Sequence, residues 1–181
     1  MLSYRSATKI VADMDILELV ERYTFQEAGN ADVVALLSPQ GLTLRQQAQQ
    51  THGLLFVEIW HEVLRRLGFD DRTVLASDSV SVFFCNYWLA RPTLMSEYIA
   101  FLERALRLLQ FDPALSSLMR ADGRYAEGRL KVAKSVFGTP FYQLHPFICE
   151  RLPVVYFWAR DACVLRVHTQ FRTVHNFTSS A

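Results

Sequence analysis

Residues 31–68, ADVVALLSPQGLTLRQQAQQTHGLLFVEIWHEVLRRLG, decide the fold class. The short apolar run 31–37 predicts a buried strand, and the residues 38–41, SPQG, predict the turn that ends it. Thr43 with Gln46 then fits a capping box, which begins a helix. Apolar residues recur at helical spacing as far as Leu67, and Gly68 ends the predicted helix. They are Leu44, Ala48, Leu55, Ile59, Val63 and Leu67.

The next part of the sequence predicts a second strand followed by a second helix. Residues 80–86 are β-branched and aromatic and begin by alternating, which predicts a strand. Pro92 then starts a predicted helix whose apolar positions run from Leu94 to Leu109. Asp112 and the proline after it end that helix.

The remaining segments predict short helical pieces to about residue 136 and an edge strand at 163–168, where apolar and polar residues alternate. We therefore expect an α/β fold with excess helix, forming one domain over residues 1–170 and followed by a polar, frayed tail at 171–181. Three short strands make a poor sheet on their own, so we also expect that part of a larger sheet is missing.

Composition and charge exclude several classes of protein. The 181 residues suit a single domain, and 51% hydrophobic residues exclude global disorder. With 19 basic and 18 acidic residues, the chain lacks the basic excess that a nucleic-acid partner requires. Charges interrupt every apolar run before it reaches the ~20 residues of a membrane span, and the first ten residues hold no signal peptide. We expect a cytoplasmic protein.

Two carboxylates follow the apolar residues 10–12. Asp13 and Asp15, at the end of a short strand, can hold Mn²⁺ or Mg²⁺ and through it the diphosphate of a nucleotide-sugar. The alternative is that Asp15, with Glu18 three residues later, forms a capping box and that Asp13 is a solvated neighbour. Both interpretations stay open.

An ionisable cluster interrupts the apolar segment HPFICERLP at residues 145–153. A carboxylate buried there is costly unless it is paired, so Glu150 requires Arg151 or a substrate as its partner. Glu150 or His145 suits a general base, because their surroundings can tune the pKa. The alternative is a structural pair of Glu150 and Arg151.

A second cluster precedes the helix that Pro92 begins. Asn86 can hydrogen-bond a sugar hydroxyl, and Tyr87 and Trp88 offer apolar faces to a sugar ring. Arg91 adds a cation that suits a phosphate. The alternative is that Asn86 caps a turn and that the aromatic residues fill the core.

These two clusters, in this order, resemble the later part of the glycosyltransferase-like proteins encoded in surface and capsular polysaccharide loci. FCNYWLARP at 84–92 leads into a helix, and GTPFY at 138–142 comes before HPFICERL at 145–152. LSYR at 2–5 and NADVV at 30–34 resemble earlier segments of that family. The likeness spans residues 2–168.

The resemblance implies a nucleotide-sugar transferase of the GT-A type, which moves a sugar from a nucleotide donor to a glycan acceptor. It implies acceptor-side and base-side roles for Asn86, His145, Glu150 and Arg151, with Arg151 or Arg91 facing phosphate. In a GT-A domain, the first ~100 residues supply the strands that bind the nucleotide. We expect this chain to lack them, so that a second chain supplies them or the protein is a non-catalytic helical interaction or sugar-binding remnant.

Overall fold

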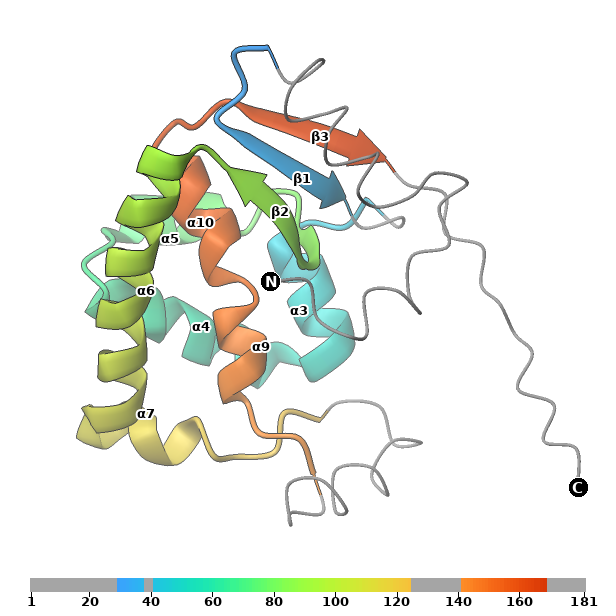
Figure 1. Ribbon diagram of the computed structural model, residues 1–181. Coiled ribbons are helices and arrows are strands. Elements are labelled where there is room, and N and C mark those ends of the chain that lie inside the picture. The colour runs from blue at the N-terminus through green and yellow to red at the C-terminus, as the bar shows by residue number, and fades with distance from the viewer. Residues whose placement is uncertain (1–28, 38–40, 125–140, 169–181) are drawn as a thin grey trace, which may run out of the picture.

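The computed structural model describes residues 29–37, 41–124 and 141–168, with the backbone alone described at 36–37, 84–87 and 167–168 (Figure 1). Helices outnumber strands in these ranges, which confirms the prediction of an α/β fold rich in helix. The elements in chain order are β1 (Val33–Leu37), α3 (Leu44–His52), α4 (Leu54–Arg66), α5 (Asp71–Ser77), β2 (Phe83–Ala90), α6 (Pro92–Phe111), α7 (Pro113–Leu118), α9 (His145–Cys149), α10 (Leu152–Ala159) and β3 (Val164–His168).

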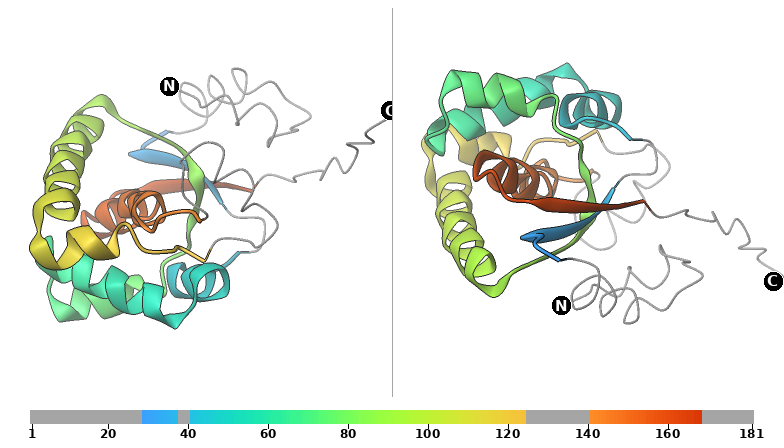
Figure 2. Two further views of the ribbon diagram at one scale, coloured as in Figure 1. Left: turned by 90° about the horizontal axis from the view of Figure 1, so that it is seen from below. Right: turned by 90° about the horizontal axis from the view of Figure 1, so that it is seen from above.

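The three strands form one mixed sheet in the order β2-β1-β3. β1 pairs antiparallel with β2, so that Ala35 lies opposite Trp88, and parallel with β3, so that Val33 lies opposite Val164. Val33 and Ala35 share one face of the sheet and are almost fully buried, because the described helices lie on that side (Figure 2). β3 is an edge strand, as the alternation of residues 163–168 predicts.

The helix predicted over residues 44–67 is wrong in one respect, because it is two helices. Gly53 separates α3 from α4 with a φ of 86° and a ψ of 175°, a backbone conformation open to glycine but strained for other residues. Just after the break, Leu55 is 58% exposed, contrary to the prediction, while Ile59, Val63 and Leu67 are buried as predicted. Phe56 and Trp60 also enter the core. The start of α3 is as predicted: Thr43 and Gln46 form the capping box.

The second predicted strand starts later than expected. Residues 81 and 82, which the sequence predicts to be part of this strand, pair instead with residues 42 and 43. Val82 N–H donates to the carbonyl of Leu42, and Ser81 forms a bridge with Thr43. β2 proper begins at Phe83. The helix after it agrees with the sequence: α6 begins at Pro92, and Asp112 ends it and caps α7 through the N–H groups of Ala114 and Leu115.

Helix α10 lies at the centre of the molecule, beside α6 and the sheet (Figure 1). Every residue from Leu152 to Phe157 is buried, because this helix is apolar on every side and is surrounded by the core. The ring of Phe157 packs against Tyr98 of α6 and Trp88 of β2, with centroids 5.3 and 5.0 Å away. Across the described ranges, no helix has the length and apolar character that crossing a membrane requires.

Candidate functional site

A pocket of about 310 Å³ lies between the end of α6, α7 and the start of α9. Backbone pairing builds it: Leu144 N–H donates to Ala121, His145 N–H donates to Met119, and Gln143 bridges to Asp122. These bonds hold the segment before α9 against the segment after α7. The lining residues are Leu106, Leu109, Gln110, Ser116, Met119, Arg120, Gln143 and His145.

Four polar side chains of this pocket have no hydrogen-bonding or ion-pair partner among the described residues. They are Gln110, Ser116, Arg120 and Gln143. Carboxamide and hydroxyl groups both donate and accept hydrogen bonds, while Arg120 donates and carries a positive charge. Leu106, which is 36% exposed, and buried Leu109 are apolar members of the lining. The pocket therefore suits a small ligand rich in hydroxyl groups, neutral or acidic.

His145 is the predicted site residue that lines this pocket. Partial burial lowers the pKa of His145 below its usual value of 6.5, so the ring is neutral at neutral pH and can accept a proton. Cys149, one turn later, has its sulfur 3.9 Å from both ring nitrogens. Burial and the charge of Glu150 raise the pKa of Cys149 to about 11, so it stays a thiol and does not form the thiolate that cysteine catalysis needs.

Arg151 lies away from the pocket, inside the protein, and is 2% exposed. Its guanidinium group donates to the carbonyl of Phe147 at 2.6 Å and to the side chain of Gln47, and it lies 4.7 Å from the centre of the Phe56 ring. These contacts join the α9–α10 junction to α3 and α4. This burial favours the structural role for Arg151. Glu150, beside it, is half-buried where α9 ends.

Trp88, in β2, and Arg91, directly after it, are predicted site residues that do not line this pocket. Trp88 is partly buried and packs edge-on against Tyr98, with centroids 5.1 Å apart. Arg91 donates to the carbonyls of Ala31 and Gly29, before β1. Trp88 therefore belongs to the core side of the sheet, and Arg91 holds the start of β1 against the start of α6.

Three predicted site residues cannot be placed as side chains. The backbone of Asn86 lies in β2, but its side chain is outside the described part of the structure, as are the whole of Asp13 and Asp15. Among the residues that the structure does describe, no group of three or more His, Cys, Asp or Glu side chains could hold a metal ion. The metal site at Asp13 and Asp15 stays a prediction.

Sequence reasoning missed a cluster formed by His61, Asp78 and Arg45. His61 Nε2 and Arg45 Nη1 each lie 2.8 Å from a carboxylate oxygen of Asp78, which joins α3 and α4 to the end of α5. No hydroxyl or thiol of the described residues hydrogen-bonds His61. Among the described residues, the cluster therefore has no nucleophile of a catalytic triad, and it joins the three helices.

The burial of His52 is expected to make stability depend on pH. Burial lowers its pKa from 6.5 to about 4; the carbonyl of Gly123 opposes this, and the charge of Arg151 adds to it. Neutral His52 therefore contributes its full stabilisation above pH 6.5, and this is lost as the pH falls toward 4, by up to about 3 kcal/mol. We expect urea unfolding to show a fall in stability between pH 6.5 and 4.5, and a smaller fall in His52→Gln. Equal falls in both proteins would contradict this role.

Comparison with known proteins identifies no relative: no protein-family model, curated protein or solved structure matches the chain. The geometry of the site is therefore the basis for assigning a function.

Proposed function

We propose that this chain is a glycosyltransferase-like protein and that the pocket between α6, α7 and α9 holds its glycan acceptor. The observation that supports this is the lining, in which amide, hydroxyl and guanidinium groups with no partner among the described residues lie near apolar side chains and a neutral histidine. Sugar hydroxyls donate and accept hydrogen bonds, which matches the amide groups of Gln110 and Gln143. The volume of about 310 Å³ lies at the lower end of small-molecule sites and suits a single sugar ring.

His145 is the base in this proposal. As an acceptor hydroxyl attacks the anomeric carbon of the donor, His145 takes the hydroxyl proton, and the bond from that carbon to the nucleotide diphosphate breaks. Glu150 is the second candidate for this role. Arg120, as the charged group in the lining, favours an acidic sugar over a neutral one.

The donor side of the proposal lies outside the described residues. It comprises a nucleotide-sugar, Mn²⁺ or Mg²⁺ where the reaction uses one, and nucleotide-binding strands from a second chain. The finer fold assignment, the later part of a GT-A domain without its first strands, belongs to the same proposal. The small sheet and many helices are compatible with it.

Titration with glucuronate and glucose tests the acceptor pocket. We expect glucuronate to bind more tightly than glucose. Gln143→Ala is expected to weaken glucuronate binding on the order of fivefold, the loss of one hydrogen bond. The matched control is Gln50→Ala, which truncates an exposed glutamine of α3 outside the pocket. Absence of binding by both sugars, or equal effects of the two substitutions, would refute the proposal.

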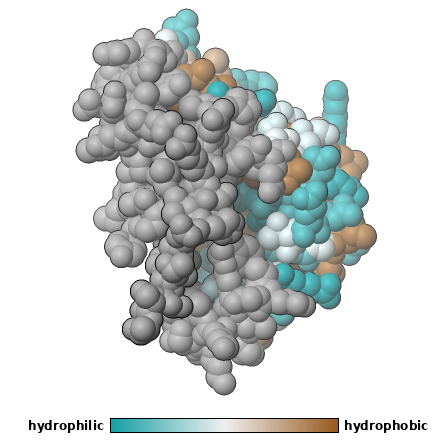
Figure 3. Space-filling model, turned by 90° about the vertical axis from the view of Figure 1, so that its right-hand side faces the viewer, coloured by the Kyte–Doolittle hydropathy of each residue, from teal (hydrophilic) through white to brown (hydrophobic). Residues whose placement is uncertain are grey.

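A non-catalytic interaction module is the second candidate, supported by large apolar side chains that the helices leave exposed. Phe111, at the end of α6, is 70% exposed, and Leu75 on α5 is 59% exposed. On the face shown in Figure 3, the hydrophobic residues of the described part appear as separate areas among hydrophilic ones. An interaction module would bind neither sugar, so the same titration separates the two functions.

A further inference from the structure

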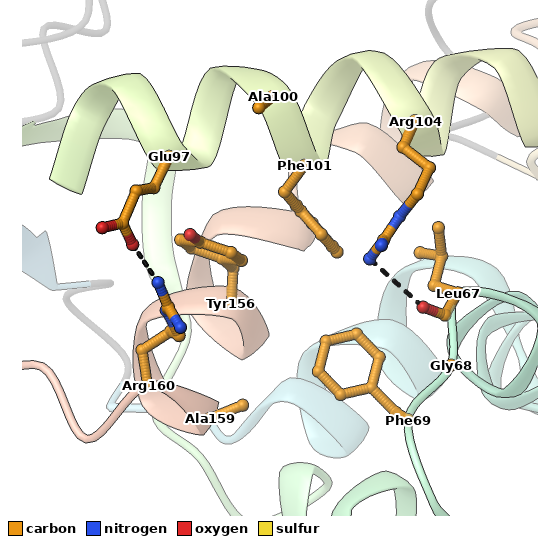
Figure 4. A pocket seen from close by; sticks show the side chains of 10 residues that line it. All are labelled: Leu67, Gly68, Phe69, Glu97, Ala100, Phe101, Arg104, Tyr156, Ala159 and Arg160. Atoms are coloured by element: carbon orange, nitrogen blue, oxygen red, sulfur yellow. Dashed lines mark hydrogen bonds and ion pairs between the residues drawn. The ribbon is translucent and has the colours of Figure 1, made fainter. Parts of the chain in front are cut away.

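A second and larger pocket, of about 510 Å³, lies between α6, the end of α10 and the turn after α4 (Figure 4). Its walls are aromatic: Phe101 from α6, Tyr156 from α10 and Phe69 from the turn. Phe101 and Tyr156 belong to the buried core, and Phe69 is partly exposed. Phe101 and Tyr156 pack on each other with centroids 4.7 Å apart and form a preformed apolar wall, and Phe69 is the more exposed ring.

Charged groups stand at the two ends of this pocket (Figure 4). At one end, Arg104 lies 5.7 Å from the centre of the Phe101 ring, and its hydrogen bond to the carbonyl of Leu67 is long, at 3.4 Å. Its other N–H groups have no acceptor among the described residues. At the opposite end, Arg160 forms an ion pair with Glu97. One end thus offers a cation with free donors, and the other offers a donor and an acceptor side by side.

We propose that this pocket binds a nucleoside monophosphate, with the phosphate on Arg104 and the base stacked against the aromatic wall, where Phe69 is partly exposed. A guanidinium group binds phosphate oxygens through parallel hydrogen bonds. Aromatic side chains bind nucleic-acid bases by stacking. The polar edge of a base carries donors and acceptors, which match the pair of Glu97 and Arg160 at the far end. The pocket volume lies in the usual range for small-molecule sites.

The nucleotide pocket is separate from the saccharide pocket. The two share no lining residue. His145 lines one at the start of α9, and Tyr156 lines the other eleven residues later near the end of α10. These positions lie on different helices, α9 and α10. A nucleotide bound here does not occupy the acceptor pocket, and its binding does not depend on the glycosyltransferase proposal.

The experiment titrates the full chain with the 5′-monophosphates of uridine, cytidine, adenosine and guanosine, with uridine and inorganic phosphate as partial ligands. We expect at least one nucleotide to bind, and to bind more tightly than either partial ligand. Arg104→Gln is expected to weaken its binding on the order of tenfold, because a charge-assisted phosphate contact is lost. The matched control is Arg107→Gln on the same helix, an exposed arginine outside the pocket, with an expected change below about twofold.

Three results would overturn the proposal. The first is that no nucleotide binds. The second is that inorganic phosphate binds as tightly as the nucleotides, which would indicate a simple anion site. The third is that Arg104→Gln and Arg107→Gln weaken binding equally, which would indicate attraction to overall charge. A circular dichroism spectrum of each variant confirms that the fold is intact, since both arginines are exposed on α6.

Discussion

Replacement of Arg151 by alanine is expected to lower the free energy of unfolding by about 3–5 kcal/mol. The substitution removes a side chain that is 2% exposed, and with it the contact to the Phe56 ring. It also leaves the buried carbonyl of Phe147 without its 2.6 Å donor. A buried polar group that loses its partner keeps the full cost of its lost hydration. Chemical denaturation, followed by circular dichroism, measures the loss.

The control for this prediction is Arg107→Ala, which removes the same charge from an exposed position on α6. Its expected effect is within about 0.5 kcal/mol. If Arg151→Ala were as stable as the parent protein, Arg151 would not be a structural residue. Its predicted role in facing a substrate phosphate would then become the better interpretation.

Replacement of Trp88 by alanine is expected to cost a similar amount, about 3–5 kcal/mol. The indole packs against Tyr98 and Phe157, and its loss opens a cavity between the sheet and α10. Trp88→Phe keeps most of these ring contacts. It also removes an indole N–H that has no acceptor among the described residues, so the expected loss is smaller.

The comparison of these two variants separates packing from sugar binding. A packing role predicts that stability follows the size of the ring and that Trp88→Phe binds glucuronate as the parent does. The contrary result is a Trp88→Ala protein of unchanged stability that no longer binds sugar. That outcome would assign Trp88 to the substrate, as the sequence suggested.

Local signals in the sequence predicted the ends of several elements. The capping box of Thr43 and Gln46 begins α3, Pro92 begins α6, and Asp112 ends α6. Each of these signals could be recognised because a capping residue or an initial proline acts within one helical turn of its own position. Gly53 was missed, because the apolar spacing continues past it while the backbone turns. The start of β2 was missed because residues 80–82 pair with a segment far away in sequence.

The candidate site was harder to predict than the fold. The sequence singles out His145 because an ionisable side chain in an apolar segment is conspicuous, and the structure places it in the lining of the pocket. Gln110, Arg120 and Gln143 carry no such signal, since each is an ordinary surface residue until α6, α7 and α9 bring them together. Arg104 and Arg160 likewise come from different helices. Arg151 lies in the same conspicuous segment, and its burial favours the structural alternative over the predicted substrate contact, which stays a prediction.

The central claim is that the pocket beside His145 binds a sugar, and amide chemical-shift mapping tests it most directly. Glucuronate is added to ¹⁵N-labelled protein, and the shifted amide signals are assigned. We predict that they cluster at Gln110, Ser116, Arg120, Gln143 and His145 and leave the amides of Arg104 and Arg160 unchanged. Shifts confined to other surfaces, or no shifts at saturating glucuronate, would contradict the assignment of this pocket as the acceptor site.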